Sequence, residues 1–177
     1  RKKKIKFLST PFDIDSFFLL KKLGLRTLKI SSGDLTNIPL LEKISLNSPK
    51  FMKIILSTGM GTIKEIDQAL KALTKYNLIK KNITILHCTS NYPASDKSVN
   101  MNALISIRKK FGNNIGYSDH TFGNIASIIA LSMGAKIIEK HFTINKLSSG
   151  PDHKISLSPK ELRHFVHDIH RASKMLG

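Results

Sequence analysis

The sequence predicts a parallel α/β fold, and three observations support this prediction. Short apolar runs rich in β-branched residues alternate with segments of helical periodicity. These pairs recur at intervals of roughly 20 to 30 residues, which is typical of repeated βα units. A polar cluster follows each apolar run, at the strand ends where both barrels and open α/β sheets build their sites.

Six strands are expected, one for each apolar run. They cover residues 5–8, 27–30, 53–56, 83–86, 115–117 and 136–138. Periodicity alone does not separate a barrel from an open sheet. Polar clusters at six strand ends favour a barrel, because an open sheet concentrates its site at one switch point.

Two helices have clear starting signals. Thr62 and Glu65 have the spacing of a capping box, and the apolar stripe that follows predicts a helix over residues 62–78. The last helix is expected to begin after Ser158, with Glu161 completing a second capping box. Each of these helices comes after a predicted strand, as repeated βα units require.

The composition excludes several classes of protein. A length of 177 residues allows one domain of ordinary size, and apolar residues along the whole chain exclude intrinsic disorder. The longest apolar runs fall far short of the ~20 residues that cross a bilayer, and no secretory signal is visible. The single cysteine, Cys88, excludes an internal disulfide framework and fits a reducing cytoplasm. Because the chain begins with Arg and not Met, we expect it to be part of a longer one.

The charge allows two interpretations. Lys and Arg total 29 against 12 Asp and Glu, a net charge of +17, which invites a nucleic-acid-binding interpretation. However, the lysines are scattered, only residues 1–6 form a dense basic cluster, and few aromatic residues could stack on bases. A solvated, repulsive surface is therefore favoured over a nucleic-acid surface, and both are compatible with a small anionic substrate.

Strand alternation brings two histidines onto related faces. Ser118 and His120 share one face of their strand, and Glu139 and His141 share one face of the next. If both faces look inward, the two imidazoles converge at one rim, where together with water or a carboxylate they suit a divalent ion such as Mn²⁺. On spacing alone, two unrelated histidines remain the alternative.

Three other features also leave alternatives open. Lys29, near the end of an apolar strand, either binds an anion such as phosphate or carboxylate, or extends to solvent from an edge. Cys88 is favoured as a core thiol over a nucleophile paired with His87, because adjacent strand residues point to opposite faces. A surface stripe is expected on the last helix from His164, His167 and His170.

Seven strings occur in order along nearly the entire chain. They are FLSTPFD (7–13), KISSGDLTNIPLL (29–41), ILSTGM (55–60), LHCTSNYP (86–93), GYSDHT (116–121), GAKIIEKHFT (134–143) and GPDHKISLSP (150–159). Together they resemble the catalytic domain of the N-acetylneuraminate (sialic acid) synthase family, which includes the N,N'-diacetyllegionaminate synthases. The related pseudaminate synthases share parts of this pattern.

The resemblance implies a fold and a reaction. The fold is a TIM (β/α)₈-type barrel, of which this chain would supply about six βα units, strands 3 to 8. The reaction condenses phosphoenolpyruvate with an N-acyl amino sugar, either N-acetylmannosamine or a bacillosamine-derived sugar. Water is consumed, phosphate leaves, and a nine-carbon 2-keto acid results. A divalent metal is implied, Mn²⁺ first and Mg²⁺ or Co²⁺ otherwise.

The resemblance also implies roles for individual residues. The catalytic residues would be Lys29, His120 and His141, of which the two histidines would bind the metal. Contacts to phosphoenolpyruvate would come from Thr10, Lys29, Ser32, Ser57 and Ser118. Ser90, at a position that some members fill with Asn, would also bind the substrate phosphate. Tyr92 and Asp152 match residues that contact the sugar. Glu139 is our addition, as a second-layer partner of the metal site.

Against the family pattern, residues 1–177 form a partial barrel domain. The first two βα units and the C-terminal antifreeze-like domain are not in this sequence, so we expect the 177-residue chain alone to be poorly stable and inactive. The full enzyme would be a cytoplasmic, domain-swapped homodimer that binds neither nucleic acid nor membrane. The alternatives are a pseudaminate synthase or another phosphoenolpyruvate-dependent synthase, a basic nucleic-acid-binding module, and a truncated product without function.

Overall fold

The computed structural model describes residues 5–177, so residues 1–4 of the basic cluster lie outside it. The chain forms two compact units, Arg1–Thr84 and Ile85–Gly177, and each is described by itself.

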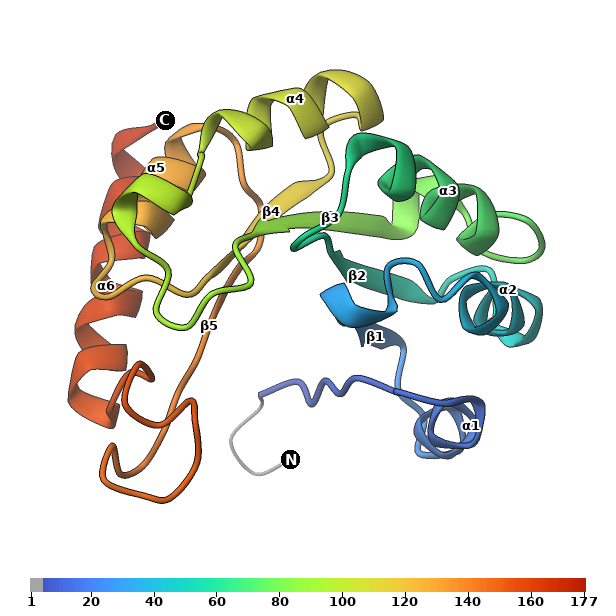
Figure 1. Ribbon diagram of the computed structural model, residues 1–177, viewed down its shortest axis with the longest axis horizontal. Coiled ribbons are helices and arrows are strands. Elements are labelled where there is room, and N and C mark those ends of the chain that lie inside the picture. Colours follow the sequence, from blue (N-terminus) through green and yellow to red (C-terminus); the bar gives the residue numbers. More distant parts are fainter. Residues whose placement is uncertain (1–4) are drawn as a thin grey trace. The chain divides into compact units, whose positions relative to one another are not determined.

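Strands and helices alternate along the chain (Figure 1). The strands are β1 (Thr27–Ile30), β2 (Lys53–Ser57), β3 (Ile83–Cys88), β4 (Ile115–Asp119) and β5 (Ile138–Lys140). The α-helices are α1 (Ile14–Lys22), α2 (Ile38–Asn47), α3 (Ile63–Leu73), α4 (Asn102–Phe111), α5 (Ile125–Ser132) and α6 (Pro159–Met175). Short 3₁₀ turns are η1 (Ser32–Asp34), η2 (Lys80–Asn82) and η3 (Asp96–Ser98). Strand order follows chain order and the described pairs are parallel, which confirms the parallel α/β prediction.

In the first unit, β1 and β2 pair in parallel, with Lys29 opposite Ile55. The helices α1, α2 and α3 lie along one side of this strand pair (Figure 1). Successive side chains of a strand alternate between faces, so every second residue belongs to the buried layer. At most 1% of each of the following side chains is exposed: Leu28, Ile30, Ile54 and Leu56.

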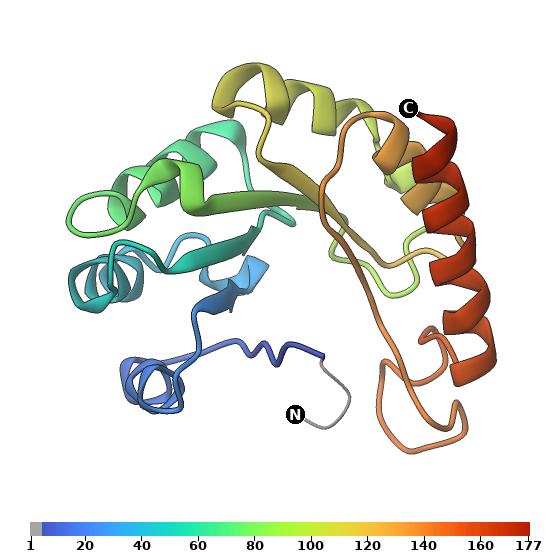
Figure 2. The ribbon, with the colours of Figure 1, turned by 180° about the vertical axis from the view of Figure 1, so that it is seen from behind.

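In the second unit, β4 pairs in parallel with β3 on one side and with β5 on the other. All six residues of β3 and all five of β4 are buried. Figure 2 shows α6 running alongside α5, and these two helices pack together in the structure. Polar groups buried on these strands cost free energy unless they are hydrogen-bonded, and among the described residues of this unit the buried Tyr117 hydroxyl has no such partner.

Two of the six predicted strands differ from the structure. Residues 5–8 form no assigned strand and are exposed, although the neighbouring Ser9 carbonyl accepts a hydrogen bond from the Lys29 N–H at 3.1 Å. The run predicted at 136–138 becomes β5, which begins at Ile138. Its ladder to β4 nevertheless starts earlier, since the Lys136 N–H donates to the Ile115 carbonyl at 2.8 Å.

The predicted helix starts are confirmed, whereas one predicted end is wrong. Capping boxes begin α3 at Thr62 and α6 at Ser158. However, α3 ends at Leu73 and not at residue 78. The end of α2 competes for the backbone there, because the Tyr76 N–H donates to Ser45 Oγ at 3.2 Å.

Two further predictions about side-chain burial are confirmed. Cys88 is buried, as expected for a core thiol, and the three histidines of the α6 stripe are exposed. Within residues 5–177, no helix combines the length and the apolar character that crossing a bilayer requires.

Candidate active site

The two histidines directly follow the last paired residues of β4 and β5. Ser118 lies opposite Glu139 and Asp119 lies opposite Lys140 in the parallel register. His120 and His141 follow by one position on their strands, so they leave the sheet on the Ser118–Glu139 face. Their ring centroids are 5.3 Å apart, at an interplanar angle of 67°.

The orientation of the His120 ring is fixed by a backbone carbonyl. His120 Nδ1 lies 2.7 Å from the Thr89 oxygen, an acceptor that requires hydrogen on this nitrogen. Nε2 then carries the lone pair in the neutral ring, with Ser118 Oγ at 3.3 Å. Burial lowers the pKa of His120, and the neighbouring His141 lowers it further, so the neutral form is favoured.

The two imidazoles fit a metal-binding role by their donor chemistry. A neutral ring whose other nitrogen is bound to a carbonyl is the usual state of a histidine ligand. Among the described residues, no group of three or more His, Cys, Asp and Glu side chains is suited to a metal ion. A cation at this pair would therefore complete its coordination with water or substrate, as the sequence predicted.

The residues predicted to contact the sugar lie beside the histidines. The Tyr92 ring centroid is 4.2 Å from that of His120 and 5.4 Å from that of His141. Asp152 Oδ2 lies 3.8 Å from His141 Nδ1. Burial raises the pKa of the Tyr92 hydroxyl, so this group stays protonated and able to donate a hydrogen bond.

Glu139 lies at the same face, as its strand position predicted. Ser118 Oγ donates to Glu139 Oε1 at 2.7 Å, joining two neighbouring strands through their side chains. If β3 continued past Cys88, alternation would place Cys88, Ser90 and Tyr92 on one face, but β3 ends at Cys88 and this expectation is wrong. Ser90 is half-buried in the segment after β3.

Of the residues predicted to bind phosphoenolpyruvate in the first unit, all except Thr10 lie at or near the carboxyl ends of β1 and β2. Lys29 is half-buried and shares a face with Ser57, which is two residues beyond its register partner Ile55. Ser57 is only 3% exposed, and its Oγ has no hydrogen-bond partner among residues 5–177. Ser32 Oγ accepts a hydrogen bond from the Gly59 N–H at 2.9 Å. Thr10 is half-buried in the segment preceding α1.

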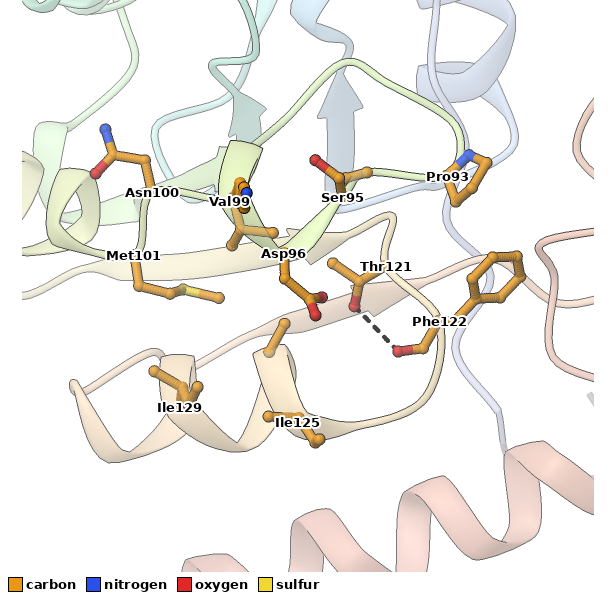
Figure 3. A pocket seen from close by; sticks show the side chains of 13 residues that line it. Pro93, Ser95, Asp96, Val99, Asn100, Met101, Thr121, Phe122, Ile125 and Ile129 are labelled. Carbon is orange, nitrogen blue, oxygen red and sulfur yellow. Dashed lines mark hydrogen bonds between the residues drawn. The ribbon is translucent and has the colours of Figure 1, made fainter.

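A groove of about 970 Å³ lies elsewhere in the second unit. Figure 3 shows its lining, which comes from residues 93–101, from Thr121 and Phe122 after β4, and from α5. Phe122 and Ile125 are largely exposed there, at 65% and 72%. None of the predicted site residues lines this groove, so it is separate from the histidine pair.

Sequence reasoning missed Asp119 and Lys140, which are buried beside the two histidines. Lys140 Nζ and Asp119 Oδ2 are 3.0 Å apart, and the side chains are 4% and 0% exposed. The sequence did contain a signal for this pair. A carboxylate and an ammonium group each directly precede a candidate histidine, in strands otherwise suited to burial, and charged residues are rarely buried unless they are paired.

Comparisons with known proteins show the family to which this sequence is similar. The model of the NeuB family matches residues 1–177. The chain is 49% identical to N,N'-diacetyllegionaminic acid synthase of Campylobacter jejuni and 42% identical to that of Legionella pneumophila. These matches cover 100% and 98% of this chain, and 52% and 48% of the relatives. The chain thus spans about half the length of these relatives.

A solved structure is similar along the same residues. The N-acetylneuraminic acid synthetase of Leptospira borgpetersenii, crystallised with citrate, matches with a TM-score of 0.89 at 38% identity. The match covers 99% of this chain and 60% of that one. This similarity confirms the fold prediction: the parallel strands and their helices are part of a (β/α)₈-type barrel.

Proposed function

This chain belongs to the NeuB family, and we propose that it supplies active-site residues to a sialic-acid-type synthase. The proposed reaction joins phosphoenolpyruvate to the open aldehyde form of an N-acyl amino sugar. Water is consumed, and the products are a nine-carbon 2-keto acid and phosphate. A legionaminate-type synthase is favoured, because the two relatives at 49% and 42% identity carry that name.

The imidazole pair after β4 and β5 is the observation that carries this proposal. The carbonyl of Thr89 fixes one hydrogen of His120 and directs the lone pair of Nε2 away from that contact. His141 lies with its ring centroid 5.3 Å away and supplies the second donor. A divalent ion held there, Mn²⁺ or else Mg²⁺ or Co²⁺, would polarise the sugar aldehyde as a Lewis acid.

Positive charge and hydroxyl groups would bind the anionic substrate. The Lys29 ammonium would pair with the phosphate or carboxylate of phosphoenolpyruvate. Ser57 supports this role, because its buried hydroxyl has no partner in the part of the chain that the structure describes, and a ligand oxygen would supply one. Further contacts are proposed from Thr10, Ser32, Ser90 and Ser118. Such groups accelerate the reaction by positioning the enol carbon and stabilising charge.

The sugar would bind at the Tyr92 and Asp152 side of the histidines. A carboxylate accepts hydrogen bonds only, so Asp152 is suited to sugar hydroxyls. The Tyr92 ring gives an apolar surface at 46% exposure and a hydroxyl donor at its tip. Glu139 would act through Ser118, whose hydroxyl donates a hydrogen bond to it.

Assays of the full-length protein test the reaction directly. The protein is incubated with Mn²⁺, phosphoenolpyruvate and either N-acetylmannosamine or an N,N'-diacetyl bacillosamine-derived sugar. Phosphate release and the product mass are then measured in parallel. We expect sugar-dependent phosphate release and a nine-carbon 2-keto acid. No product with any N-acyl sugar, together with salt-sensitive DNA binding that Lys29→Ala leaves unchanged, would contradict the proposal and favour a nucleic-acid-binding module.

Two finer points belong to the same proposal. A product from the pseudaminate precursor alone would identify a pseudaminate synthase instead. We also propose that the full-length protein is cytoplasmic, a location that fits its buried Cys88 thiol. We propose further that it is a homodimer, which sedimentation of the full-length protein would test. The 177-residue chain by itself is expected to release no phosphate, because it holds only part of the barrel.

A further inference from the structure

A buried ion pair lies on the opposite face of the strands from the histidines. Asp119 and Lys140 face each other across β4 and β5, directly before His120 and His141. Their charged atoms are 3.0 Å apart, and their side chains are at most 4% exposed. The Lys140 ammonium also lies 5.9 Å from the centre of the Phe165 ring of α6.

The Asp119 carboxylate is fully used by protein donors. Oδ1 accepts from the N–H and from the Oγ1 of Thr121, both at 2.8 Å. Oδ2 accepts from Ser127 Oγ at 2.5 Å and from Lys140 Nζ. Two oxygens offer about four lone-pair sites in all, so this carboxylate is not available as a metal ligand.

These contacts surround His120 on both sides in the chain. Asp119 precedes it and binds the backbone of Thr121, which follows it. Lys140 Nζ donates to the Thr121 carbonyl at 2.6 Å, and Lys140 immediately precedes His141. The pair therefore connects the two backbone segments that carry the imidazoles. Shifting one strand by a residue would separate the two charges and move the histidine of that strand to the opposite face.

We propose that Asp119 and Lys140 are positioning residues for the imidazole pair. They fix the register of β4 and β5 and the turn at Thr121, so that both rings leave the sheet on one face. One consequence of this role, the affinity of the histidines for a divalent ion, rests on the proposed function. The geometry of the rings is a separate consequence that needs no metal.

The test uses the full-length protein and Mn²⁺ alone as probe. The variants are Asp119→Asn, Lys140→Met, and the apolar double variant Asp119→Leu with Lys140→Met. The matched control is Lys75→Met, which breaks the exposed Lys75–Glu42 pair, whose nitrogen–oxygen distance is 2.9 Å. Mn²⁺ affinity is followed by paramagnetic resonance, thermal unfolding by circular dichroism, and histidine tautomers by ¹⁵N NMR of the metal-free protein.

We expect the single variants to bind Mn²⁺ about 10- to 100-fold more weakly, the range typical for lost outer contacts of a metal site. Each also lowers the unfolding temperature, because one buried charge loses its partner. The apolar double variant regains most of the unfolding temperature and not the affinity. A folded double variant that binds Mn²⁺ within about twofold of the parent would overturn the proposal, because the pair would then serve stability alone.

The control for the proposed function is His120→Ala. If His120→Ala binds Mn²⁺ as tightly as the parent, the proposed metal site is wrong. The tautomer of His120 then tests whether Asp119 and Lys140 position the ring. A mixed tautomer of His120 in the double variant then supports a positioning role. An unchanged Nδ1–H tautomer in that variant overturns it.

Discussion

The two groups of predicted site residues differ in how fully the protein satisfies them. In the second unit the polar groups contact one another: Ser118 donates to Glu139, Thr89 accepts from His120, and Asp152 lies near His141. In the first unit, Ser32 also accepts a hydrogen bond, from the Gly59 N–H, but the Ser57 hydroxyl is buried without a partner among the described residues.

This difference separates a site that the protein orders by itself from one that a ligand completes. Groups with mutual hydrogen bonds are preorganised, so that binding costs them little conformational entropy. A buried hydroxyl without a partner carries a desolvation cost that a bound anion can remove. Under the proposed function, the residues of the second unit would orient the imidazole donors, and the Ser57 hydroxyl of the first unit would hydrogen-bond the anionic substrate.

The largest effect is expected at the preorganised group. Changing His141 or His120 to Ala removes one of the two imidazole donors and should lower turnover by about a hundredfold or more in the full-length protein. Steady-state phosphate release measures it. His170→Ala, on the exposed stripe of α6, is the matched control and should leave turnover unchanged. Equal effects of His170→Ala and His141→Ala would remove the distinction.

Ser118→Ala should reduce stability, because it deletes a hydrogen bond to a carboxylate inside the protein. Hydrogen bonds to charged groups contribute about 1.5–3 kcal/mol, so we expect a loss of about 2 kcal/mol in the free energy of unfolding. Urea unfolding of the full-length protein measures this. A variant as stable as the parent would show that the Ser118–Glu139 contact does not order the site.

Ser57→Ala should have the opposite profile. The hydroxyl makes no hydrogen bond within the protein, so its removal should leave the unfolding free energy within about 0.5 kcal/mol or raise it. The KM for phosphoenolpyruvate should rise about tenfold, as expected for one lost hydrogen bond to an anion. Unchanged KM would indicate that Ser57 does not contact this substrate.

The smallest effect concerns pH. Burial lowers the pKa of His87, whose Nε2 lies 2.8 Å from the Val99 carbonyl. Below pH 6.5 the unfolded chain therefore binds more protons at this residue, and stability falls as pH drops until the native pKa is passed. One such group contributes at most about 1.4 kcal/mol per pH unit. His87→Asn should flatten the slope of unfolding free energy between pH 7 and 5, whereas the exposed His170→Asn should not.

Much of the fold could be predicted, because local chemistry dictates it. The apolar runs at β1, β2, β3 and β4 and the capping boxes at Thr62 and Ser158 require only neighbours in sequence. The end of α3 was wrong because Ser45, in another helix, competes for the backbone of residue 76. Residues 5–8 form no assigned strand because their side chains remain exposed and no regular ladder forms along them.

The candidate site was predicted in part for the same reason. Strand alternation correctly paired Ser118 with His120 and Glu139 with His141, because those residues belong to or directly follow regular strands. It did not apply to Tyr92, which lies beyond the end of β3 and reaches the histidines through a loop. The buried Asp119–Lys140 pair was missed because the sequence does not give the register of β4 and β5, and only that register places the two charges opposite each other.

The sequence by itself determined the alternation of strands and helices, the residue types at each strand end and the family to which the chain belongs. These depend on spacing and on the order of residues, which the chain carries in one dimension. Only the tertiary structure decided which polar groups satisfy one another and which, like the Ser57 hydroxyl, are left without a partner. The physical reason is that desolvation and hydrogen bonding depend on contacts between residues distant in sequence, and these exist only after folding.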